Sequence, residues 1–158
     1  MEQFIFGQIR VQVLNSCVVR VEQSGNGKFF DKDTFLIPNR KEVCDDDVCA
    51  MACDGGVAVG NYTICLPQNT SDIADVKVVR DGKVVYVCGN TDNSGELPTL
   101  DKTPDVYAVA DNPRIVVPQG GYSADRNGEY EIDEKSQDVY LILCDGDFKL
   151  LRSLYVAL

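Results

Sequence analysis

Apolar and polar residues alternate along the first part of the chain. Residues 8–13 and 17–22 place valine, isoleucine or cysteine at every second position, with mostly polar residues between them. A period of two predicts half-buried strands. Residues 24–27 (Ser-Gly-Asn-Gly) supply a tight turn, and residues 34–37 predict a third strand. This N-terminal β-meander predicts an all-β fold, an antiparallel β-sandwich.

Two turns that contain glycine predict further hairpins. Asp81-Gly82 separates two valine-rich runs, residues 74–80 and 83–88, and suits a type I′ turn. Asp54-Gly55-Gly56 is a second turn signal of the same kind. Residues 138–144 are almost continuously apolar and predict a strand that is buried on both faces. Further strands are expected at residues 48–53, 57–59, 62–66, 106–110 and 114–117.

The pattern changes to that of a helix at the end of the chain. Apolar residues recur every three or four positions from Phe148 to Leu158, and either Asp145 or Asp147 is a candidate N-cap. We therefore expect a sandwich domain over residues 1–145 and a helix over residues 146–158. Because the helical pattern reaches Leu158 without a stop signal, we expect this helix to lead into a further domain.

The composition excludes some classes of molecule as binding partners of this chain. The chain has 158 residues, of which 44% are hydrophobic, enough for one domain with a sizeable core. Its net charge of −10 argues against nucleic acid and anionic membranes as partners, since both require a basic patch. The sequence shows neither a membrane-spanning apolar run nor a secretory signal. Together with an odd number of cysteines, seven, this predicts a reduced, cytoplasmic protein.

The residue types present exclude several kinds of catalytic and metal-binding site. Histidine is absent, which excludes a Ser-His-Asp or Cys-His arrangement and histidine metal ligands. Cys44, Cys49, Cys53 and Cys65 lack the two short pairs that structural zinc sites usually show, so we expect no metal and no cofactor. Acidic residues are numerous enough for a glycosidase carboxylate pair, but spacing alone singles out no pair.

Several short motifs follow one another along almost the whole chain. They are Arg20-Val21-Glu22, Gly25 to Gly27, Phe29-Phe30-Asp31-Lys32-Asp33-Thr34, Asn39-Arg40, Asn93 to Asp101, Asp111-Asn112-Pro113-Arg114, Asp138 to Leu143 and Gly146 to Leu151. In this order and spacing they resemble the N-terminal region of glycoside hydrolase family 31, the α-glucosidase and α-xylosidase family.

The resemblance implies a galactose-mutarotase-like sandwich that is followed, in the family, by a (β/α)8 barrel. In that family the barrel carries both catalytic aspartates of a retaining mechanism. The chain would then hold no catalytic residue and would be inactive alone. Its partners would be the barrel of the same polypeptide and, in the parent enzyme, an α-linked glucoside or xyloside.

The resemblance also implies a substrate loop. In the family a loop of this sandwich reaches the mouth of the barrel, and the matching segment here is residues 90–105. Asp101 is the candidate for a carboxylate that binds a sugar hydroxyl, with Thr99 and Asn93 behind it. The alternative for Asp101 is an ordinary loop aspartate in solvent.

Two other functions remain open. The chain could be a freestanding carbohydrate-binding module, although it has no tryptophan and its other aromatic residues mostly occupy strand or helix positions. It could also be a structural β-sandwich without sugar chemistry. If a barrel normally covers the C-terminal helix, the chain by itself should expose an apolar patch there and self-associate.

Overall fold

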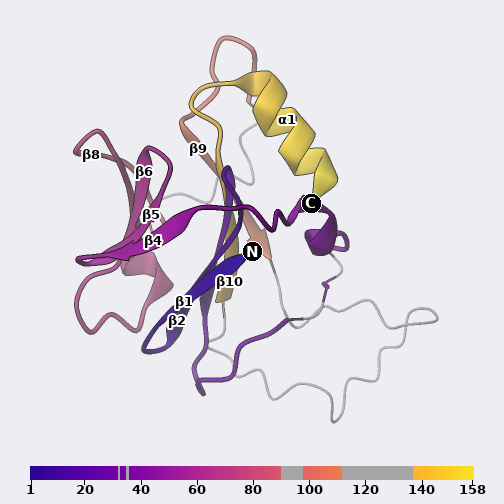
Figure 1. Cartoon of the computed structure of the whole chain (residues 1–158). Coiled ribbons are helices and arrows are strands. Elements are labelled where there is room, and N and C mark those ends of the chain that lie inside the picture. The colour runs from indigo at the N-terminus through magenta and orange to yellow at the C-terminus, as the bar shows by residue number, and fades with distance from the viewer. Residues whose placement is uncertain (32, 35, 90–97, 112–136) are drawn as a thin grey trace, which may run out of the picture.

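Two antiparallel β-sheets of five strands each form the main part of the structure (Figure 1). The computed structural model describes residues 1–31, 33–34, 36–89, 98–111 and 137–158. The strands of the first sheet, in spatial order, are β1 (Glu2–Phe6), β2 (Ile9–Asn15), β3 (Val18–Gln23), β10 (Gln137–Leu143) and β9 (Val106–Asp111). Those of the second are β4 (Ala50–Cys53), β5 (Gly56–Val59), β6 (Tyr62–Cys65), β7 (Lys77–Arg80) and β8 (Lys83–Val87).

The main hydrophobic core lies between the two sheets. The first sheet contributes Val11 and Val21, and the second contributes Val57, Ile64 and Val78, all with no exposed surface. These residues occupy alternate positions of their strands, as the period of two requires. The expectation of an antiparallel β-sandwich with one C-terminal helix is therefore confirmed.

A second, smaller apolar cluster covers the outer face of the first sheet. The helix α1 (Phe148–Ala157) begins at Asp147, whose carboxylate accepts hydrogen bonds from the backbone amides of Lys149 (2.8 Å) and Leu150 (3.0 Å). Leu151 of the helix packs in a cluster with Ile142 of β10. The C-terminal end of the helix lies beside the short 3-10 helix η1 (Arg40–Val43) (Figure 1). None of the described helices has the length and apolar character needed to cross a bilayer.

The local predictions have mixed outcomes. The Asp81-Gly82 turn is confirmed, since both residues have a positive φ, as a type I′ turn needs. The strand expected over residues 34–37 is wrong. The amide of Thr34 instead donates to the carbonyl of Ile37 (3.2 Å), and the amide of Ile37 donates to the Thr34 hydroxyl (3.1 Å), which closes a turn.

Two further differences concern the expected strands. The first part of the run 74–80 lies in a second 3-10 helix, η2 (Ile73–Asp75), so that β7 begins only at Lys77. The side chain of Asp72 caps η2 by accepting from the amide of Ala74 (2.8 Å), which competes with strand pairing. The strand expected at 114–117 lies outside the described residues.

Candidate functional site

The turn around Asp101 is the described part of the predicted substrate loop. The amides and carbonyls of Thr99 and Lys102 bond to each other in both directions (3.0 and 3.4 Å), so that Leu100 and Asp101 form the tip. Thr99 and Asp101 are both exposed, and the structure brings them together in this one turn. Asn93 lies outside the described residues.

The base of this turn is bound to the segment between β10 and α1. The carbonyl of Asp105 accepts from the amides of Cys144 (2.9 Å) and Asp145 (3.0 Å). The carbonyl of Pro104 accepts from the amide of Gly146 (3.1 Å) and from the Cys144 thiol (3.0 Å). These bonds fix the base of the turn while its tip stays in solvent.

Arg80 joins the second sheet to the same base. Its guanidinium donates to the Asp105 carboxylate (3.2 Å) and to the Tyr62 hydroxyl (3.4 Å), and it forms an ion pair with Asp145. The bond to Tyr62 raises the pKa of Arg80, and burial raises the pKa of Tyr62. An exposed carboxylate beside a hydroxyl, on an anchored turn, is suited to hydrogen-bonding the hydroxyl groups of a ligand.

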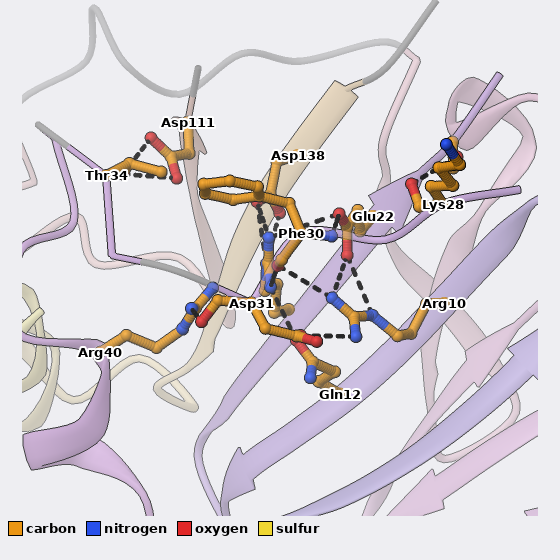
Figure 2. A network of polar contacts seen from close by, with 12 residues as sticks. Arg10, Gln12, Glu22, Lys28, Phe30, Asp31, Thr34, Arg40, Asp111 and Asp138 are labelled. Atoms are coloured by element: carbon orange, nitrogen blue, oxygen red, sulfur yellow. Dashed lines mark hydrogen bonds and ion pairs between the residues drawn. The ribbon is translucent and has the colours of Figure 1, made fainter. Parts of the chain in front are cut away.

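A network of buried charges lies on the outer face of the first sheet (Figure 2). The guanidinium of Arg20 donates through Nε to both carboxylate oxygens of Asp138 (2.8 and 3.0 Å) and through Nη2 to one of them (2.5 Å). Both side chains are fully buried. Arg10 donates to the Glu22 carboxylate through Nε (2.9 Å) and Nη2 (2.5 Å), and Gln12 accepts a further bond from Arg20 (2.8 Å).

This network holds a covering segment, residues 28–31, 33–34 and 36–40, on the sheet (Figure 2). The amide of Phe30 donates to Glu22 (2.7 Å), and its carbonyl accepts from Arg10 (3.0 Å) and Arg20 (2.7 Å). The neighbouring Asp31 forms an ion pair with Arg10 (2.6 Å). Each buried charge thus has a partner on another strand or on the covering segment, as burial of charge requires.

The middle and the C-terminal end of the covering segment are also bound. The hydroxyl of Thr34 lies 2.8 Å from both carboxylate oxygens of Asp111 at the end of β9. Arg40 donates to the carbonyl of Asp31 and, at 3.4 Å, to the hydroxyl of Tyr140 on β10. The covering segment therefore connects β2, β3, β9 and β10 through polar contacts, mostly buried ones.

Burial sets the protonation behaviour of the network. Burial raises the pKa of the Glu22 carboxyl, and the opposing attraction of Arg20 and Arg10 does not reverse this shift. For Arg20, burial favours the neutral form, but the Asp138 carboxylate outweighs it and raises the pKa. Burial also raises the pKa of Tyr140. Because Arg20 and Asp138 have no exposed side-chain surface, we assign this network to structure and not to contact with a ligand.

The cysteines show no arrangement typical of a structural metal site. All seven are free thiols. Cys53 and Cys65 occupy one row of the second sheet, on either side of Gly56, while the thiol of Cys44 lies 3.4 Å from the carbonyl of Arg40. Within the described part of the chain, no group of three or more His, Cys, Asp or Glu side chains is placed to hold a metal ion.

Thiol reactivity should follow burial. Cys49 and Cys53 are exposed, whereas Cys144 has no exposed surface and burial raises its pKa to about 11. At pH 8, iodoacetamide should therefore modify Cys49 and Cys53 rapidly and Cys144 only after unfolding. Mass spectrometry of the labelled peptides measures this order, with the guanidinium-unfolded chain as control. Equal rates at Cys49 and Cys144 in the folded chain would contradict it.

Sequence reasoning placed Thr99 and Asp101 in a loop but missed the residues that hold that loop. The hairpin pattern identifies Arg80 only as the last residue of a strand. Its acidic partners Asp105 and Asp145 are 25 and 65 residues away, a separation over which no local pattern exists. One feature of the sequence does point to such a contact. Arg80 ends a valine-rich strand, and an arginine that is partly buried there needs a carboxylate partner.

The sequence matches no model of a known protein family and no curated protein.

Proposed function

We propose that this chain is the N-terminal β-sandwich domain of a family 31 glycoside hydrolase. In the parent enzyme, which would hydrolyse α-glucosides or α-xylosides with retention, its role would be to pack on the catalytic barrel and to contribute a substrate loop. The domain itself would hold no catalytic residue. The seven free thiols support a reducing, cytoplasmic environment for the parent protein.

The convergence of the family-like motifs is the observation that carries this proposal. Arg20 and Glu22 of the first motif bond to Asp138 and Phe30, which belong to motifs up to 118 residues away. Thr34, from the same motif as Phe30, bonds to Asp111 of β9, and Arg40, from a further motif, bonds to Tyr140 of β10. Five of the eight motifs thus contribute side chains or backbone groups to linked polar contacts on one face of the first sheet, which supports the view that their order is not accidental.

The turn at 98–105 supports the second half of the proposal. Asp105 binds its base to Arg80 of the second sheet and to the segment between β10 and α1, and its tip exposes the hydroxyl of Thr99 and the carboxylate of Asp101. A loop whose tip is presented by a fixed base loses little entropy when a ligand binds. This is the arrangement expected of a loop that adds to a site formed mainly by another domain.

Turnover tests the proposal. The isolated 158-residue chain should not cleave 4-nitrophenyl α-glucoside or α-xyloside. The polypeptide extended by the coding sequence that follows Leu158 should contain a barrel with aspartates at its strand ends and should cleave one of them. Measurable turnover by the isolated chain, or an extension without such a barrel, would overturn the proposal.

The same extended enzyme tests the role of Asp101. Asp101→Ala should raise KM about tenfold or more and leave kcat unchanged, because the carboxylate would bind ground state and transition state alike. Asp46→Ala is the matched control, since Asp46 is an exposed aspartate far along the chain from this turn. An unchanged KM in Asp101→Ala would remove Asp101 from the substrate site and leave the domain assignment standing.

A further inference from the structure

A groove opens at the end of the sandwich opposite to the Asp101 turn. It lies between the β1–β2 turn, with Gly7 and Gln8, and the segment 66–71 that follows β6, and it has a volume of about 520 Å³. Arg80, which holds the Asp101 turn, pairs with Tyr62 at the start of β6, whereas the groove begins beyond the last residue of that strand. The two sites are therefore separated by the length of the sandwich (Figure 1).

The groove has an apolar floor. Phe6, at the end of β1, is half-buried and packs against the main core. Leu66 is buried in the same core, and Pro67 beside it is exposed. An aromatic ring next to aliphatic and proline surface offers a place to bury the C–H groups of a ligand.

The rim of the groove is polar but uncharged. Gln8, Gln68, Asn69 and Ser71 are exposed and line it, and none of the lining residues is Asp, Glu, Lys or Arg. In a chain with a net charge of −10, such a neutral lining is unusual. Carboxamide groups both donate and accept hydrogen bonds, as hydroxyl groups do.

The rim is also preformed. The amide of Thr70 donates to the carbonyl of Pro67 (3.1 Å), and the Thr70 hydroxyl lies 3.0 Å from the Asp75 carboxylate of η2. Asn69 has a φ of +61°, which places it at a tight turn. Because the rim is already ordered, it loses little conformational entropy when a ligand binds.

We infer that this groove binds a neutral carbohydrate. Sugars combine hydroxyl groups, which carboxamides recognise, with apolar C–H faces, which the floor around Phe6 would bury. A charged ligand would find no side chain of opposite charge among the lining residues to replace its hydration. A volume of about 520 Å³ lies within the range of small-molecule sites and suits a short oligosaccharide. The inference rests on the lining of the groove and not on the proposed function.

Nuclear magnetic resonance titration of the whole chain with maltotriose and xylotriose tests the inference. Saturable shifts, at millimolar concentration or below, are expected for the amides of Gln8 and residues 66–71 with at least one of these probes. Gln68→Ala should weaken this binding about tenfold, the effect of one lost hydrogen bond of average strength or slightly above. Asn61→Ala is the matched control, because Asn61 is an exposed carboxamide at the opposite end of β6 and should change nothing.

A charged rim variant and a charged ligand distinguish the remaining explanations of the shifts. Ser71→Glu, which places a charge on the rim, should also weaken binding, and thermal melting checks that both variants fold. Absence of saturable shifts with both probes would overturn the inference. Equally tight binding of trigalacturonate would show that the groove does not prefer neutral sugars and would overturn that part of the inference. Shifts that are confined to residues 98–105 and disappear in Asp101→Ala would place the sugar at the Asp101 turn. They would overturn sugar binding in the groove and leave the proposed function unaffected.

Discussion

Replacing Arg20 by methionine should lower the free energy of unfolding by about 3–5 kcal/mol. The variant leaves the Asp138 carboxylate buried without its three bonds from the guanidinium, which range from 2.5 to 3.0 Å. It also removes the bonds from Arg20 to Gln12 (2.8 Å) and to the carbonyl of Phe30 (2.7 Å). Guanidinium unfolding followed by far-ultraviolet circular dichroism measures the loss.

Two further variants show whether the loss comes from the unpaired charge. Arg152→Met removes an exposed arginine of the helix and should change stability by no more than about 0.5 kcal/mol. Arg20→Met combined with Asp138→Leu should recover most of the loss, since removing both partners leaves no buried charge between them. A loss below about 1 kcal/mol in the single variant would show that Asp138 is not held in a dry environment.

The fold class was predictable because it follows from local patterns. Alternation identified β2 and β3, an Asp-Gly turn identified the β7–β8 hairpin, and spacing identified α1. Each of these signals arises within about ten residues, where strand and helix periods are directly visible. The double burial of β10 was also visible, since its residues are apolar at nearly every position.

The buried network was not predictable from the same patterns. Arg20 and Glu22 occupy the polar positions of an alternating strand, and alternation assigns such positions to solvent. The covering segment excludes that solvent, and the local pattern wrongly predicts a strand within it at 34–37. The burial of Arg20 depends on Asp138, 118 residues away, and such a contact leaves no trace in a local window.

The candidate site, too, could be predicted from the sequence only in part. The resemblance places Thr99 and Asp101 together, and the structure has them in one turn. The role of Arg80 depends on how the two sheets are placed against each other, which no single strand reveals. The groove at the other end of the sandwich was missed for the same reason, since its two walls come from Gln8 and from residues 66–71.

The glycine pair in the β4–β5 turn gives the second large effect. Gly56→Ala should cost about 3 kcal/mol, at the upper end of typical overpacking losses. A Cβ atom at Gly56 would lie 2.0 Å from the carbonyl oxygen of Ile64 and 3.1 Å from the Cα of Cys65. Both atoms are backbone of the neighbouring strand β6, so they cannot withdraw without breaking the pairing of Gly56 with Cys65.

Gly55 provides a matched comparison one residue away. It has a φ of +77°, and a Cβ atom there would meet only the carbonyl oxygen of Leu66, at 4.0 Å. Gly55→Ala should therefore cost about 1–2 kcal/mol, through backbone conformation alone. Gly55→Asn should cost less, because asparagine tolerates this conformation. Guanidinium unfolding of the three variants measures the order. If Gly56→Ala lost no more than Gly55→Ala, strands β5 and β6 would not approach as closely at this point as the structure has them.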